Sequence, residues 1–148
     1  MRKTIILCPV IIIFTAGGCM FSPHSPAKAR DRANEFLKEL YINEDAEEAL
    51  SMTNDEFLKT YDKTYLIKLA DKMRSKFGPA EGFKADFYVL DPRDLDIQLY
   101  YRHMAEKGII YSRIILRKDS EGIYRVSGIT SSPIPHEKFR TAVKFNKK

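Results

Sequence analysis

Two alternating stretches and the turn between them decide the fold, and they lie in residues 95–118, LDIQLYYRHMAEKGIIYSRIILRK. In the first stretch, apolar side chains recur at every second position: Leu95, Ile97, Leu99 and Tyr101. A period of two is typical of a strand with one buried face. Residues 105–108, Ala-Glu-Lys-Gly, then form a turn, and the chain enters a second strand over residues 109–118. We therefore expect an antiparallel hairpin here.

The same pattern continues on both sides of this hairpin. Residues 83–90 place Phe83, Ala85, Phe87 and Val89 on one face, and a polar turn at residues 91–94 follows them. After a second polar turn at residues 119–122, residues 123–130 form another strand. Four strands joined by short polar turns predict an antiparallel meander.

Helical periodicity precedes the strands. Apolar residues are spaced by three and four over residues 27–42 and again over residues 61–77, which end at Gly78-Pro79. Asn43, followed by acids, predicts a further helix start, and residues 53–56 fit a capping box. Helices first and strands after predict an α+β fold, with N-terminal helices packed on a curved antiparallel four-stranded sheet.

This order of elements resembles the NTF2-like (cystatin-like) superfamily. The segments that carry the resemblance are residues 27–42, residues 61–77 and the strands between 83 and 130, and the likeness lies in architecture rather than in a motif. The resemblance implies a cone-shaped space between the helices and the sheet. Members of the superfamily include small bacterial lipoproteins, and the superfamily performs catalysis, ligand binding and assembly alike.

The first eighteen residues have the composition of an export signal. Arg2 and Lys3 precede an apolar run over residues 5–14, which is shorter than the roughly 20 apolar residues of a spanning helix. Small residues at 16–18 follow the run. We therefore expect residues 1–18 to be a signal peptide that is removed.

The residues Ala16-Gly17-Gly18-Cys19 resemble a bacterial lipobox. The resemblance implies cleavage before Cys19, a diacylglycerol on its sulfur and an acyl chain such as palmitate on its amino group. The alternative is an ordinary secretory signal that is cut after Ala29. Met20, which is not an acid, resembles the signal of lipoproteins sent to the outer membrane, so in a Gram-negative cell we expect the protein on the periplasmic side of that membrane.

Composition and charge exclude several classes of protein. Apolar residues make up 44% and charged residues 30% of the 148 residues, which argues against a disordered chain and against a polytopic membrane protein. The net charge of +5 arises at the chain ends, because residues 133–148 hold five basic residues and one acid. We therefore expect no nucleic-acid partner. The predicted organisation is a signal peptide (1–18), a tether (19–26), one α+β domain (27–132) and a basic tail (133–148) with few apolar residues.

Few residues suggest chemistry. None of the three histidines, His24, His103 and His136, has a second metal ligand at a suitable spacing, so we expect no metal, no cofactor and no catalytic residue. Tyr101 and His103 share the inward face of their strand and are the candidate lining of a cone pocket. The plainer alternative for His103 is a partly solvated histidine at the end of a strand.

The opposite face of the sheet carries aromatic and basic residues. Alternation assigns to it the candidate interface residues Tyr88, Tyr100, Arg102, Tyr111 and Arg113. Tyr and Arg are enriched where protein surfaces meet, although the same residues are also ordinary neighbours on a solvated sheet. The sequence therefore favours a lipid-anchored, non-enzymatic protein of the cell envelope that binds another protein or a second copy of itself. The alternative function is a small-molecule binder or hydrolase that uses the cone pocket.

Overall fold

Helices fill the first half of the domain and strands fill the second half. The computed structural model describes residues 24–90, 95–136 and 141–145. Within them the helices are α1 (Pro26–Tyr41), α2 (Ala46–Ser51), α3 (Asp55–Thr60) and α4 (Lys63–Phe77). The strands are β1 (Ala80–Leu90), β2 (Asp96–Ala105), β3 (Gly108–Lys118), β4 (Tyr124–Ser132) and β5 (Val143–Lys144).

The helix boundaries follow from side chains that cap the first turns. Asp45 accepts hydrogen bonds from two backbone N–H groups of α2, Asn54 accepts one from Phe57 at 2.9 Å, and Asp62 accepts one from Tyr65 at 2.8 Å. The cap of α2 is thus Asp45 rather than the predicted Asn43. Gly78, at a φ of +80°, ends α4 where the sequence predicts a stop.

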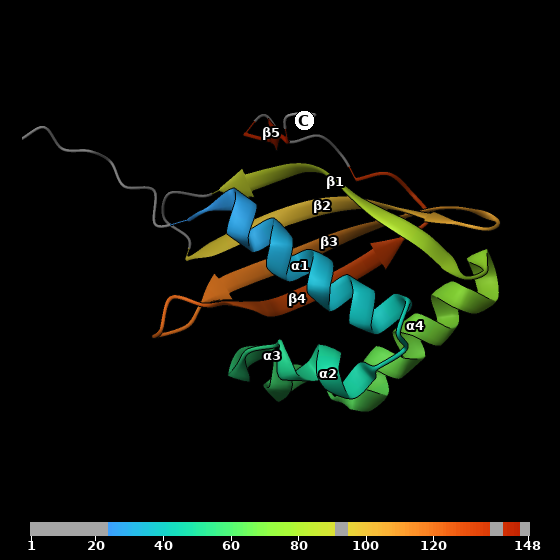
Figure 1. Cartoon of the computed structure of the whole chain (residues 1–148), viewed down its shortest axis with the longest axis horizontal. Coiled ribbons are helices and arrows are strands. Elements are labelled where there is room, and N and C mark those ends of the chain that lie inside the picture. The colour runs from blue at the N-terminus through green and yellow to red at the C-terminus, as the bar shows by residue number, and fades with distance from the viewer. Residues whose placement is uncertain (1–23, 91–94, 137–140, 146–148) are drawn as a thin grey trace, which may run out of the picture.

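The strands form one open antiparallel sheet in the order β4-β3-β2-β1-β5. All four helices lie on the same side of it, and α1 crosses the sheet while α4 runs below α1 toward the β2–β3 turn (Figure 1). This arrangement confirms the α+β class and the order of helices before an antiparallel sheet. The sheet has one strand more than predicted, because β5 pairs with β1.

The core lies between α1 and the inward face of the sheet. The periodic side chains of α1 are fully buried or nearly so: Ala29, Ala33, Phe36, Leu37 and Leu40. They pack against the inward residues of three strands, namely Ile97, Leu99, Tyr101, Ile114, Leu116, Val126 and Ile129. Burying each large aliphatic or aromatic side chain contributes about 1.5–3 kcal/mol, so this layer is the main source of stability.

A β-bulge in β1 corrects the predicted facing of that strand. Ala85 pairs with Tyr101 but Phe87 pairs with Tyr100, so Asp86 is an extra residue in β1. Beyond the bulge the alternation reverses: Tyr88 packs toward the core, and Phe87 stacks on Tyr100 on the outer face at 4.5 Å between ring centroids. The predicted inward facing of Phe87 and Val89 and the predicted outward facing of Tyr88 are therefore wrong.

The segment predicted as a separate basic tail returns to the sheet. β5 pairs with β1 through Val143 and Lys144, and the N–H of Phe145 donates to the carbonyl of Asp86 at 3.2 Å. The ring of Phe145 lies 5.1 Å from that of Tyr88 and packs against the core cluster. The described part of this segment therefore belongs to the domain. Residues 137–140 and 146–148 lie outside the described residues, as do the predicted signal peptide and Cys19.

Candidate functional site

His103 is buried in the inward face of β2 and is the polar centre of the candidate site. Its side chain has no solvent exposure, so the alternative of a partly solvated histidine is wrong. The rings of Phe83 and Tyr41 meet it edge-on at 4.9 and 5.4 Å between centroids. Neither Nδ1 nor Nε2 has a hydrogen-bond partner among the described residues. Buried polar atoms are nearly always bonded, so this exception calls for a ligand or a water.

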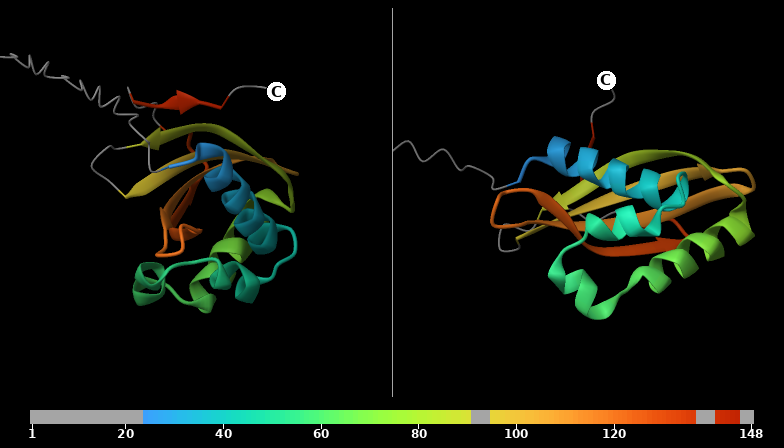
Figure 2. Two further views of the ribbon diagram at one scale, coloured as in Figure 1. Left: turned by 60° about the vertical axis from the view of Figure 1, so that its left-hand side comes forward. Right: turned by 60° about the horizontal axis from the view of Figure 1, so that its bottom comes forward.

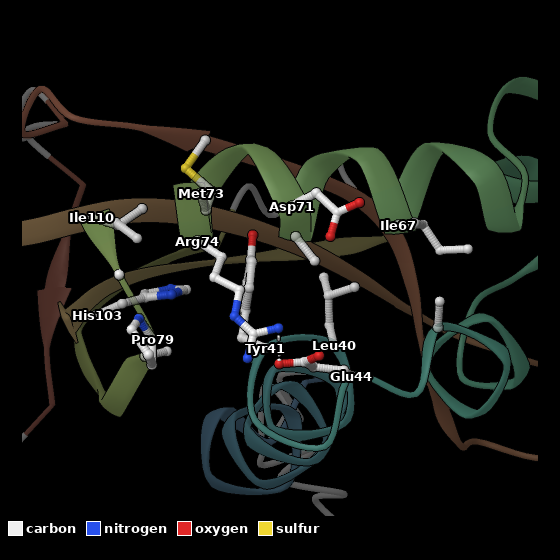
Figure 3. Close-up of a pocket in the computed structure, with 14 residues that line it drawn as sticks. Leu40, Tyr41, Glu44, Ile67, Asp71, Met73, Arg74, Pro79, His103 and Ile110 are labelled. Atoms are coloured by element: carbon white, nitrogen blue, oxygen red, sulfur yellow. Dashed lines mark ion pairs between the residues drawn. The ribbon is translucent and has the colours of Figure 1, made fainter. Parts of the chain in front are cut away.

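A cavity of about 270 Å³ lies beside His103. It is enclosed by the end of α1, by one side of α4 and by the chain that enters β1 (Figure 3). Most of its wall is apolar, and the apolar side chains are Leu40, Ala46, Ile67, Ala70, Met73, Pro79, Ala80 and Ile110. His103 and Tyr41 also line the cavity, and in this structure the surrounding atoms cover both ring nitrogens of His103. The cavity therefore combines apolar walls with a few polar groups, as ligand sites usually do.

Charged side chains stand at the exposed edge of the cavity. Arg74 of α4 forms an ion pair with Glu44, which lies between α1 and α2, and Figure 3 shows the two side chains meeting there. Both are about half exposed, and such pairs contribute little stability because water screens them. Glu44 adopts a φ of +57°, a left-handed conformation that fixes the turn after α1. The pair can therefore open to admit a molecule at small energetic cost.

Tyr41 connects the cavity to a short hydrogen-bonded chain in the sheet. Its hydroxyl lies 3.2 Å from Oγ of Ser131, which lies 2.6 Å from Oγ of Ser112. Burial raises the pKa of Tyr41 to about 12, so the phenol is neutral near pH 7. Sequence reasoning missed Tyr41 and this serine pair. The available signal was that Ser112 and Ser131 occupy inward positions of their strands, where an apolar residue is expected.

Tyr101, the other predicted pocket residue, has a different role. Its hydroxyl has one hydrogen, which is shared between Oδ1 of Asn34 at 2.9 Å and the carbonyl oxygen of Arg30 at 3.2 Å. Burial raises its pKa above the ordinary value, so it is also neutral. The Tyr101 and His103 rings are 6.4 Å apart, but only His103 lines the cavity described above. Tyr101 holds α1 on the sheet.

The surroundings of His103 make it a weak base. Burial lowers the pKa of His103 to about 3, which makes the imidazole a weak base near neutral pH. Efficient general bases have a pKa near the working pH. Among the described residues, no cluster of three histidine, cysteine or acidic side chains is placed to hold a metal ion. A neutral imidazole can still donate one hydrogen bond and accept another.

The bulge in β1 and the C-terminal segment change which of the predicted interface residues are exposed on the outer face. Tyr100 is only 2% exposed, because the Phe87 ring stacks on one side of it and the His136 ring lies 5.2 Å away. Arg102 makes a bidentate ion pair with Asp86 at 2.5 and 2.6 Å. Tyr111 and Arg113 remain half-buried on the outer face. Tyr100, a predicted interface residue, is therefore not available to a partner on this face.

A second cavity, of about 650 Å³, lies between the outer face and the C-terminal segment. Its lining includes the Arg102–Asp86 ion pair, Tyr111 and His136.

In residues 24–90, 95–136 and 141–145, no helix combines the length and the apolar character needed to cross a bilayer. Comparisons of the chain with protein-family models, with curated proteins and with solved structures gave no match.

Proposed function

We propose that this chain is a lipid-anchored protein of the cell envelope that binds a small molecule in the His103 cavity without catalysing its conversion. The observation that carries the proposal is His103 itself, which is fully buried, lines the cavity and has no partner for either ring nitrogen within the described chain. Leaving such a group without a partner costs about 1–3 kcal/mol. A ligand that reaches a ring nitrogen, once the atoms that cover it move aside, recovers this energy.

The lining defines the class of ligand. The walls favour an apolar body, and neutral His103 and Tyr41 favour an uncharged polar group such as a hydroxyl, carbonyl or amide. A full charge placed against the neutral imidazole would lose its hydration without forming an ion pair there, because the charged residues of the lining, Glu44, Asp71 and Arg74, come from α4 and from the turn after α1. The cavity volume of about 270 Å³ lies at the lower end of ordinary ligand sites, so the ligand is the size of a substituted single ring.

The finer fold assignment is part of the proposal. Helices that precede an open antiparallel sheet and cover one face of it are consistent with the NTF2-like (cystatin-like) architecture. The cavity lies where that architecture has the mouth of its cone, between the helices and the sheet. These features support the assignment.

The anchor rests on the sequence and gains support from the start of the domain. Cleavage after Ala29 would remove the first turn of α1 and Ala29, which is fully buried in the core. It would also remove Ser25, whose N–H donates to the Tyr124 hydroxyl at 2.6 Å. Cleavage before Cys19 leaves all these contacts in place. Lipidation at Cys19 is therefore the better proposal.

A protein-binding role has less support. A partner on the outer face would contact Tyr111, Arg102 and Arg113, because residues of the chain itself cover Tyr100. The side chain of Arg102 is already engaged by Asp86. The cavity therefore supports small-molecule binding better than this face supports protein binding.

The test compares phenol with benzene as probes of the cavity. Residues 19–148 with Cys19→Ser are titrated with each probe while the imidazole NMR signals are followed. We expect phenol to shift the His103 signals and to bind at least fivefold more tightly than benzene, because only phenol bonds to the ring nitrogen. His103→Leu should abolish this preference.

The matched control is His136→Leu, which removes a histidine from outside the cavity and should keep the preference for phenol. Equal binding of phenol and benzene by the unsubstituted domain, or an unchanged preference in His103→Leu, would contradict the proposal. Failure of both probes to bind at millimolar concentration would contradict it as well.

A further inference from the structure

We propose that one end of the sheet rests on the lipid bilayer. This end, called the turn end, comprises Leu95, the β3–β4 turn at residues 119–123 and the start of α1. The inference rests on the proposed lipid anchor at Cys19 and adds to it an orientation and a contact surface. Its partner is the headgroup region of the membrane that holds the anchor.

The start of the described chain is fixed at the turn end. The N–H of Ser25 donates to the hydroxyl of Tyr124 at 2.6 Å, and the His24 ring stacks on the Tyr124 ring with an interplanar angle of 26°. Tyr124 is the first residue of β4 and directly follows the β3–β4 turn. The right-hand view of Figure 2 shows the start of α1 beside this turn. A lipid anchor at Cys19 therefore connects the membrane to this end of the domain.

The length of chain before His24 limits which surfaces can reach the membrane. Five residue steps separate Cys19 from His24, and they span at most roughly 18 Å when fully extended. β2 has ten residues and spans about 33 Å. The opposite end of the sheet, at the β2–β3 turn, is therefore farther from His24 than the tether can reach. The turn end lies within reach of the headgroups.

The turn end exposes apolar side chains. Leu95 is 69% exposed and Ile123 is 41% exposed. Asp96 pairs with Arg117 and Lys118 pairs with Tyr124, so the two residues stand at the same end of three neighbouring strands. Adjacent strands are about 4.8 Å apart, which places the two backbones roughly 10 Å from each other. One flat surface can therefore contact both side chains.

Two of the acids near these side chains are paired, whereas Glu121 of the same turn is exposed. Asp96 forms a bidentate ion pair with Arg117 at 2.8 and 3.0 Å. Asp119 accepts hydrogen bonds from the backbone N–H groups of Glu121 and Ile123 and pairs with Arg125 at 3.1 Å. The pairing of these carboxylates weakens their repulsion of an anionic membrane surface. The same bonds hold Ile123 in its exposed position.

The experiment compares two dye positions in the full lipidated protein. Cys19 is acylated in the proposed mature chain, so Ser120→Cys or Lys107→Cys supplies a single free thiol for a nitrobenzoxadiazole dye. Both residues are exposed in turns, Ser120 at the turn end and Lys107 at the opposite end. The protein is reconstituted into vesicles of phosphatidylcholine and phosphatidylglycerol that carry a nitroxide on their headgroups. We expect quenching of the Ser120 dye to be at least twice that of the Lys107 dye.

A second pair of variants tests the apolar side chains themselves. With the dye at position 120, Leu95→Ser combined with Ile123→Ser should reduce the excess quenching by half or more. The matched control combines Met104→Ser with Ile134→Ser, which removes two exposed apolar side chains elsewhere and should change nothing. Flotation with the vesicles, which reports the anchor, should be the same for all variants.

The outcomes separate the anchor from the orientation. Protein that floats with the vesicles but is quenched equally at both positions, or more strongly at position 107, overturns the inference and leaves the anchor standing. Unchanged quenching after the Leu95 and Ile123 substitutions overturns it in the same way. Protein that does not float with the vesicles overturns the proposed anchor and this inference together.

Discussion

At the scale of single residues, burial determines the protonation state of His103. Phe83 and Tyr41 surround its ring, Tyr41 is neutral, and the charged residues that line the same cavity are Glu44, Asp71 and Arg74. No carboxylate among the described residues bonds to the imidazole, so a proton on it would be a buried charge without compensation. Its pKa therefore falls to about 3 from the ordinary value of 6.5.

This lowered pKa predicts a loss of stability in mild acid. Below pH 6.5 the unfolded chain binds a proton at His103 that the folded chain does not bind, so the free energy of unfolding decreases as the pH falls from 6.5 toward 3. Above pH 7 both states are neutral and the group has no effect. We expect about 2 kcal/mol to be lost at this residue between pH 7 and pH 5.

Urea denaturation at pH 7 and pH 5 measures the effect. His103→Leu removes the titrating group, so its stability should fall by about 2 kcal/mol less than that of the unsubstituted protein over the same interval. Comparing the decrease in the free energy of unfolding of the two proteins cancels the contributions of the other titrating groups. Equal falls would show that His103 takes up its proton in the folded protein.

At the scale of secondary-structure elements, the C-terminal segment completes the edge of the sheet. β5 lies beside β1, and Phe145 packs against Tyr88 while the Arg30 guanidinium lies 5.4 Å above the Phe145 ring. The sequence predicted this segment as a basic tail outside the domain, with few apolar residues. The structure leads to the opposite expectation, because these residues close the end of the core.

Phe145→Ala should therefore lower the free energy of unfolding by about 2 kcal/mol, roughly half the cost for a fully buried phenylalanine, because Phe145 is half-buried. The matched control is Val143→Ala in the same strand, where the side chain is 47% exposed. Its cost should stay within about 0.5 kcal/mol. Chemical denaturation of both variants measures the difference. Two variants as stable as the unsubstituted protein would show that this segment does not pack on the core.

The sequence predicted the elements better than it predicted their details. Periods of 3.6 and 2 placed the long helices and four strands, because each of these elements buries one continuous face. The bulge at Asp86 escaped prediction, since it depends on contacts across strands with Arg102 and Tyr100 that no local pattern contains. β5 escaped because a two-residue strand has no period.

The candidate site was predicted only at its centre. His103 lies on the predicted inward face of β2, and alternation sufficed to place it there. Tyr41, Glu44 and Arg74 reach the same cavity from elements that are distant along the chain. Their convergence depends on how α1 and α4 cross the sheet, which is a property of packing that local periodicity does not determine.

At the scale of the whole molecule, the proposed anchor at Cys19 lies five positions before His24, where the described part of the domain begins. Replacing Cys19 with Ser should prevent acylation and leave either unprocessed precursor or a form that stays in the aqueous phase of a detergent partition assay. The unsubstituted protein should enter the detergent phase, because two or more acyl chains hold a protein on a bilayer almost permanently. Intact mass identifies the processed species. A processed Cys19→Ser protein that still enters the detergent phase would contradict lipidation at this residue.

The contacts of α1 also determine when the domain can fold. The bond between Ser25 and Tyr124 and that between Tyr41 and Ser131 join residues 99 and 90 positions apart. α1 is made first, yet β4, which it contacts through both bonds, is made more than 80 residues later. Contacts of such long range slow folding, because the chain between them must be ordered before they form. α1 therefore cannot complete its contacts until β4 has been made, and β5, which pairs with β1, follows β4 in the chain.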